Sequence, residues 1–219
     1  MPTVKPLKQL TLRLPVLAAL VLAIFSSPMV TAAPSVESAR LELERDSRDG
    51  VRGNPDGTIT IVEFLDYQCT YCRIMEPRLA ELIKTDSRIR LVIKEFPVLG
   101  ANSSFAAGIA LAARLQGEDR YFALHDRFFL RSGGLPPEMV IKLSKESGLD
   151  IEKLGVDVNR PEIKEQLARN QDLARRLGIK GTPNFVIGKK LIPGAIELDE
   201  LRAIIAEVAA ESPSKSPKK

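Results

Sequence analysis

The hydrophobic pattern of the chain changes from strand spacing to helix spacing near residue 69. Residues 58–66 are rich in β-branched and aromatic side chains and follow the turn-forming run 53–57, so they predict a buried strand. Apolar residues after position 73 recur at helical spacing, which predicts a helix that starts near Cys69. A second strand is predicted over residues 89–96. Together these segments indicate a parallel βαβ unit, with its chemistry at the carboxyl end of the first strand.

A long block without strand character follows this unit. The pattern predicts helices separated by glycines at four places, residues 103–115, 120–130, 136–147 and 162–177. Strand character returns at residues 184–187 and 190–192, and a last helix is predicted over residues 198–210. The predicted fold class is therefore α/β, with a sheet that is interrupted by a block of helices.

The first 32 residues have the pattern of a secretory signal peptide. Basic residues precede an apolar stretch over residues 14–25, and small residues suited to cleavage follow at residues 30–33. Twelve apolar residues are too few to span a bilayer, which needs about 20. We interpret residues 1–32 as a cleaved signal peptide, which predicts export to an oxidising compartment.

The charge of the chain is concentrated at its ends. The formal net charge is +4, but residues 1–32 and 212–219 each carry three basic residues and no acid, which leaves about −2 between them. No nucleic-acid-binding surface is expected from this balance. Residues 212–219 are rich in Pro, Ser and Lys and are predicted to be disordered. Residues 33–50 predict a short charged lead-in helix, with a short oligomerisation stalk as the alternative.

Only two cysteines occur in 219 residues, in the sequence Cys69-Thr70-Tyr71-Cys72 at the predicted helix start. The unpaired N–H groups of a helix start favour a thiolate, so Cys69 is the expected nucleophile and Cys72, one turn further on, the resolving thiol. A zinc site is the first alternative, but it needs about four ligands from Cys, His or carboxylate, and the chain offers no third cysteine and only one histidine, His125. A permanently closed structural disulfide is the second. We expect no metal and no cofactor, and a packed or surface role for His125.

Three segments, residues 61–72, 94–99 and 178–188, resemble the thioredoxin superfamily and more closely the DsbA-like periplasmic thiol:disulfide oxidoreductases. The resemblance implies a thioredoxin fold with an inserted helical domain. The thioredoxin-like domain is then expected over residues 51–99 and 178–211, with the helical insertion over residues 100–177. It also implies a periplasmic location.

The resemblance further implies roles for individual residues. Thr182 and Pro183 match a cis-proline loop that faces the cysteines and binds extended substrate peptide, and Thr70 and Tyr71 are the substrate-contacting residues between the cysteines. Glu63 matches a buried acid that moves a proton to and from Cys72. The alternative for Glu63 is a salt bridge with Lys94.

The leading functional hypothesis is a monomeric oxidase that passes a disulfide to unfolded or misoxidised secreted proteins and is recharged by a membrane redox partner. The threonine before Pro183 and the tyrosine before Cys72 also resemble disulfide isomerases of the DsbC and DsbG kind. Those are dimers with an N-terminal domain, for which only about twenty residues are left here. An isomerase or reductase kept reduced by a partner therefore remains the alternative, and a peptide-binding periplasmic chaperone is the alternative of another class.

Overall fold

The computed structural model describes residues 1, 3 and 41–211. Apart from residues 1 and 3, the predicted signal peptide lies outside the described residues, as do the first part of the predicted lead-in helix and the tail 212–219. The strands are β1 Gly50–Gly53, β2 Ile59–Leu65, β3 Ile89–Glu95, β4 Asn184–Ile187 and β5 Lys190–Pro193. The helices are α2 Thr70–Thr85, α3 Ala101–Arg114, α4 Glu118–Leu130, α5 Pro137–Glu146, α6 Ile151–Asp157, α7 Pro161–Arg176 and α8 Leu198–Glu211.

The five strands form one sheet in the order β1-β3-β2-β4-β5. Strands β2 and β3 are parallel and are joined through α2, which confirms the predicted βαβ unit. The other three pairings are antiparallel. Because β2 is the central strand, Glu63 lies between Ile93 of β3 and Phe185 of β4.

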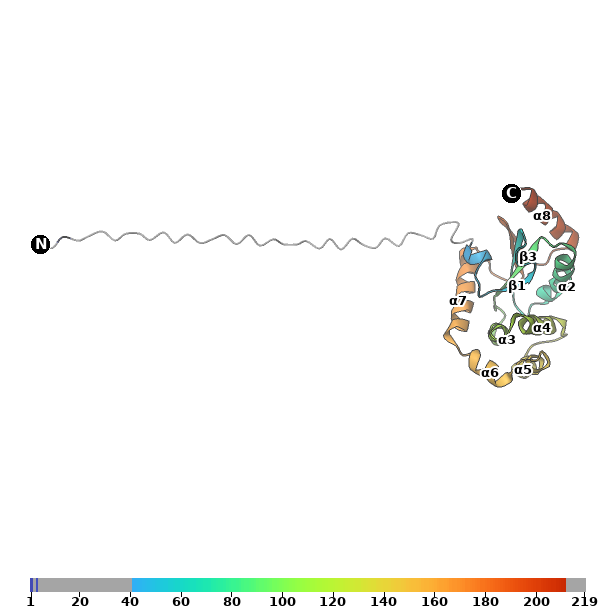
Figure 1. The fold of residues 1–219 in the computed structure, drawn as a ribbon, viewed down its shortest axis with the longest axis horizontal. Coiled ribbons are helices and arrows are strands. Elements are labelled where there is room, and N and C mark those ends of the chain that lie inside the picture. Colours follow the sequence, from blue (N-terminus) through green and yellow to red (C-terminus); the bar gives the residue numbers. More distant parts are fainter. Residues whose placement is uncertain (2, 4–40, 212–219) are drawn as a thin grey trace, which may run out of the picture. The chain divides into compact units, whose positions relative to one another are not determined.

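Helices cover both faces of the sheet (Figure 1). Alternate β2 side chains, among them Ile61 and Leu65, join a hydrophobic cluster with residues of α2 and α8. The intervening Val62 and Phe64 join a second cluster with Leu173 of α7. The period-2 alternation of β2 therefore divides the core into two layers, with the cysteines in the first.

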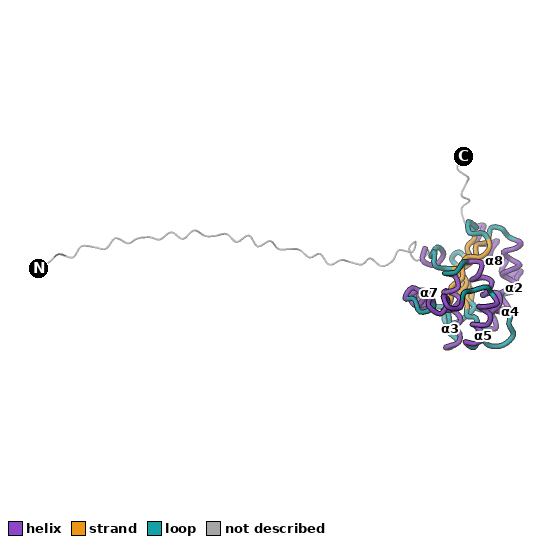
Figure 2. The backbone as a smooth tube through the Cα atoms, turned by 60° about the horizontal axis from the view of Figure 1, so that its bottom comes forward, coloured by secondary structure: helices purple, strands orange, loops and turns teal. Residues whose placement is uncertain are grey.

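The helices α3 to α7 lie between β3 and β4 in the sequence, where the pattern predicts no strand. Helices α3, α4 and α5 pack against one another, and α4 also contacts α2 (Figure 2). Their buried side chains belong to the same hydrophobic cluster as the α2 face of the sheet. The helical block is thereby anchored beside the helix that carries the cysteines. Among the described residues, no helix combines the length and the apolar character needed to cross a membrane.

The structure differs from the sequence prediction at three short segments. Helix α6 and the edge strand β1 have no counterpart in the prediction, because β1 begins and ends with glycine and α6 contains Gly155, and glycine is disfavoured in both kinds of element. The lead-in helix ends at Glu44, not at Gly50, where β1 begins. Only glycine fits at Gly50, because a Cβ there would lie 2.4 Å from a ring carbon of Tyr121.

Candidate active site

Cys69 is the N-cap of α2. Its backbone is extended, with φ −78° and ψ 118°, and its N–H donates to the carbonyl of Asp66 at 2.9 Å. The Cys69 Sγ accepts the N–H of Cys72 at 3.4 Å and lies 3.2 Å from the carbonyl oxygen of Thr182, to which the thiol donates. Both cysteines are free thiols, and both are buried. A sulfur atom thus takes the place that a serine or aspartate oxygen usually has at a helix start.

The pKa values of the two thiols are shifted in opposite directions. Hydrogen bonding from Cys72 is the largest effect that lowers the pKa of Cys69, to about 6, against the opposing effect of burial. Burial raises the pKa of Cys72, and the hydrogen bond to Cys69 and the charge of Glu63 act in the same direction. Near neutral pH the reduced pair therefore holds a thiolate at Cys69 and a thiol at Cys72.

The Thr182–Pro183 peptide bond is cis, as the resemblance implied. The loop faces the cysteines, because the Thr182 carbonyl is the group in contact with Cys69. The Pro183 carbonyl accepts the N–H of Gly194 at 2.9 Å, which ties the loop to the segment after β5. Thr70 and Tyr71 are exposed, with Tyr71 at 61%. The structure therefore joins Cys69, Cys72 and the Thr182 backbone, and leaves the two intervening side chains turned to solvent.

Glu63 is 1% exposed and lies on the β2 face that carries Ile61 and Leu65. Its Oε2 is buried and has no hydrogen-bond partner within the part of the chain that the structure describes. Burial raises the pKa of Glu63 well above its usual value, and the charges of Glu76, Glu95 and Cys69 add to the effect. The surroundings of Glu63 therefore favour the neutral carboxylic acid over the carboxylate.

The alternative of a salt bridge between Glu63 and Lys94 is wrong. The Lys94 ammonium is fully buried and pairs with Asp49 at 2.6 Å, and it also donates to the carbonyl of Glu42 at 2.9 Å. Lys94 of β3 therefore binds the segment before β1 and does not neutralise Glu63. Sequence reasoning missed Asp49, because nothing in the local pattern marks it as buried.

Asp66 is a further site residue that the sequence pattern did not single out. Its Oδ1 accepts the N–H of Gln68, and its Oδ2 accepts those of Val98 and Leu99 at 2.8 and 3.0 Å. One carboxylate thus joins the loop before Cys69 to the loop after β3. An aspartate at the end of a buried strand, two residues before a backbone turn, is the signal that could have found it.

A buried hydrogen-bond network lies behind the Cys69 loop. The Glu95 Oε1 accepts the hydroxyls of Tyr67 at 2.7 Å and Tyr121 at 2.9 Å, and burial raises the pKa of Glu95 to about 8. The Nδ1 of His125 lies 3.1 Å from the Tyr67 hydroxyl, and its Nε2 lies 3.1 Å from the Glu76 Oε2. Of the two positions predicted for His125, packed or at the surface, the structure shows the packed one, with the side chain fully buried among aromatic rings.

Within residues 41–211, one group of ligand-type atoms has a spacing that suits a metal ion. Glu76, His125 and Asp126 each offer an atom within 4.8 Å of the others. The Arg52 guanidinium already lies between the two carboxylates, at 2.5 Å from Glu76 and 2.9 Å from Asp126. The position for a cation is therefore taken by an arginine.

A family model described as a DSBA-like thioredoxin domain matches residues 60–206. The chain belongs to the DsbA-like thioredoxin family. It is 40% identical to a thioredoxin-like oxidoreductase from Silicibacter pomeroyi, with a TM-score of 0.76 over 80% of this chain and 99% of that one. A periplasmic thioredoxin-like protein from Salmonella enterica is 28% identical, with a TM-score of 0.69 over 78% of this chain and 96% of that one. The predicted thioredoxin fold with inserted helices is confirmed.

Curated relatives fall into two groups. The chain is 26% identical to a probable disulfide bond formation protein D from Bacillus anthracis, over 64% of this chain and 69% of that protein. It is also 26% identical to a Na⁺/H⁺ antiporter NhaA of Salinispora tropica, over 75% of this chain. The match spans only 25% of the antiporter's length. DsbA-like domains therefore also occur as parts of larger proteins.

The acidity of Cys69 gives a pH prediction. The folded pKa lies below that of an unfolded cysteine, about 8.5, so the thiolate stabilises the folded reduced protein fully above that pH. The stabilisation is lost as the pH falls through about 6. Ultraviolet thiolate absorbance of reduced wild type should titrate with a midpoint near 6, and the denaturation midpoint of the reduced form should fall over the same range. Cys69→Ser should remove the transition, and its persistence in that variant would contradict the assignment.

Proposed function

We propose that this protein is an exported thiol:disulfide oxidoreductase that introduces disulfides into folding proteins through a mixed disulfide at Cys69. The observation that carries the proposal is the lowered pKa of Cys69 at the start of α2. A thiolate that is stabilised only in the reduced protein favours the dithiol over the disulfide. The oxidised pair then tends to pass its disulfide on to other thiols.

The chemistry requires two exchange steps. A substrate thiolate attacks the Sγ of Cys69 in the oxidised pair, the bond to Cys72 breaks, and Cys72 leaves as a thiolate that takes up a proton. A second substrate thiolate then attacks the substrate sulfur of the mixed disulfide and expels the Cys69 thiolate. Two electrons pass from the substrate to the pair, and the substrate gains one disulfide.

Glu63 is proposed to supply the proton in the first step. The raised pKa makes Cys72 a poor leaving group, because thiols of high pKa leave slowly. A neutral carboxylic acid on the same core face, with an oxygen free of hydrogen bonds among the described residues, can protonate it. Thr182 and Pro183 are proposed to bind the substrate backbone, and Thr70 and Tyr71 to contact its side chains.

The partners follow from this reaction. The substrates would be unfolded or misoxidised secreted proteins in the periplasm, and a membrane protein that accepts two electrons would regenerate the disulfide. The signal-like pattern of residues 1–32 and the likeness to a periplasmic protein support the location. Similarity to a probable disulfide bond formation protein supports the direction of exchange. We propose that the protein is a monomer.

The reduction potential of the Cys69–Cys72 pair tests the direction of exchange. The protein without residues 1–32 should be equilibrated with glutathione buffers of increasing ratio, and its free thiols counted. A potential near −120 mV (about the value of a strong periplasmic oxidant) is expected for an oxidase. A potential of about −180 mV or lower, together with an oligomer on sizing, would favour the isomerase or reductase instead. If the cysteine pair never equilibrates with glutathione, the peptide-binding chaperone is the function that remains.

Separate serine variants test the roles of the two thiols. Cys72→Ser should accumulate substrate proteins covalently joined to Cys69, because no resolving thiol can release them. Cys69→Ser should form no such adducts, since Cys72 is buried and its pKa is raised. Non-reducing gels of exported protein fractions measure the adducts. Adducts on Cys69→Ser and none on Cys72→Ser would reverse the assigned roles.

The proton-transfer role of Glu63 is tested by Glu63→Gln, which keeps the shape of the side chain. The oxidised variant should react with a thiol peptide about tenfold or more slowly near pH 7, because Cys72 then leaves without a nearby acid. The thiolate titration of Cys69 should keep its midpoint near 6. Glu81→Gln, on the exposed part of α2, is the control. Equal rates for wild type and Glu63→Gln at every pH would exclude the role.

A further inference from the structure

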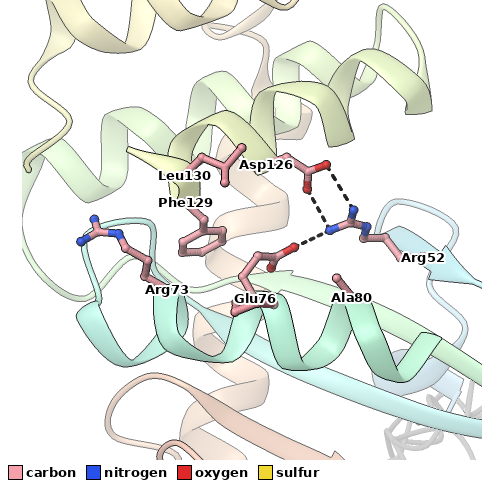
Figure 3. Close-up of a pocket in the computed structure, with 8 residues that line it drawn as sticks. Arg52, Arg73, Glu76, Ala80, Asp126, Phe129 and Leu130 are labelled. Carbon is pink, nitrogen blue, oxygen red and sulfur yellow. Dashed lines mark hydrogen bonds and ion pairs between the residues drawn. The ribbon is translucent and has the colours of Figure 1, made fainter. Parts of the chain in front are cut away.

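A pocket of about 420 Å³ lies between α2 and α4, and one of its lining residues, Arg73, directly follows Cys72 in α2. Phe129 and Leu130 come from the end of α4, and Glu76 and Ala80 from α2 (Figure 3). Phe129 is buried among the aromatic rings of the core, while Leu130 is 84% exposed although it is a large apolar side chain. The pocket therefore has an apolar wall that continues to the surface.

The charged groups of the pocket differ at its two ends (Figure 3). At one end Arg52 is paired with Glu76 and Asp126, so these charges neutralise one another. At the other end is Arg73, whose side chain forms no hydrogen bond or ion pair within residues 41–211. Its Nε is buried without a partner in that range. Arg73 is therefore a half-buried cation without an anionic partner among the described residues.

The pocket is within reach of a polypeptide that is bound to Cys69. Arg73 follows Cys69 by one turn of α2, and its N–H donates to the Cys69 carbonyl at 3.1 Å. Four residues of helix correspond to about 6 Å along the axis, whereas an extended peptide advances about 3.3 Å per residue. A side chain two to four residues away from a cysteine joined to Cys69 can therefore reach Arg73 and the apolar wall.

We propose that this pocket selects substrate polypeptides that carry a large apolar side chain and a carboxylate within four residues of the reactive cysteine. The apolar side chain would pack on Phe129 and Leu130, and the carboxylate would pair with Arg73. The inference rests on the proposed function, because it assigns a substrate class to the same reaction. It concerns a surface that lies on the α4 side of the cysteines and is formed without Thr182 or Pro183.

Short peptides with one cysteine test the proposal. One carries leucine and glutamate two and three residues after the cysteine, a second has lysine in place of glutamate, and a third has serine in place of leucine. Their rate constants with the oxidised protein should be compared with that of glutathione, which is too short to fill the pocket. Wild type should react about fivefold faster with the glutamate peptide than with the lysine peptide, as expected for a partly exposed ion pair.

Arg73→Gln should bring this ratio to about one, and Arg73→Glu should reverse it. Leu130→Ser should slow both leucine peptides about threefold or more, and leave the serine peptide unchanged. The matched controls are Arg175→Gln, an exposed arginine of α7, and Val156→Ser, an exposed apolar residue of α6. Both should behave as wild type. An unchanged glutamate-to-lysine ratio in Arg73→Gln would overturn the proposal.

Failure of the proposed redox function would give a different result from failure of the pocket proposal. In that case neither glutathione nor any peptide would exchange with the wild-type disulfide. Peptides with serine in place of cysteine would still test the pocket, through their affinities measured by calorimetry. The glutamate peptide should then bind more tightly than the lysine peptide to wild type, and equally to Arg73→Gln. No preference in wild type would reject the pocket independently of the redox reaction.

Discussion

The hydrogen bond from the Cys72 N–H to the Cys69 Sγ is the contact on which the rest of the site depends. It caps α2 with a sulfur atom, so the start of the helix and the reactive thiolate are set by the same geometry. The cap requires extended backbone at Cys69, which the end of β2 and the three N–H groups bound by Asp66 provide. The position at which the central strand β2 ends thereby affects the pKa of the Cys69 thiol.

Two carboxyl groups, those of Glu95 and Glu63, are buried in the core and differ in their hydrogen bonds. The Glu95 Oε1 accepts hydrogen bonds from two tyrosines, which compensates its burial in part and fixes the aromatic side chains behind the cysteines, while its Oε2 is buried without a partner among the described residues. Glu63 has an Oε2 without a partner among the described residues, which costs about 1–3 kcal/mol of stability. Glu63 differs from Glu95 in accepting no side-chain hydroxyl among the described residues, which is consistent with the proton-transfer role proposed for it.

The main strands, the long helices and the redox pair could be predicted from the sequence, because each has a local signal. The alternation of β2, the helical spacing of α2 and the two cysteines between them all lie within residues 58–85. The partners of charged residues have no local signal. Lys94 was a candidate partner for Glu63 and instead pairs with Asp49, a residue 45 positions away. Such pairings depend on strand register, which only the folded chain determines.

The side chains of the two residues between the cysteines do not account for the lowered pKa of Cys69. Thr70 and Tyr71 are neutral and exposed, so their side chains offer no positive charge to the Cys69 thiolate. The lowered pKa of Cys69 therefore comes from Cys72, the Thr182 side chain and the N–H groups of the first turn. Within the thioredoxin superfamily the corresponding thiol has a pKa of about 3.5 in DsbA and about 7 in thioredoxin. The pKa of Cys69, about 6, lies between those two values, and the backbone N–H groups at the start of α2 contribute to it.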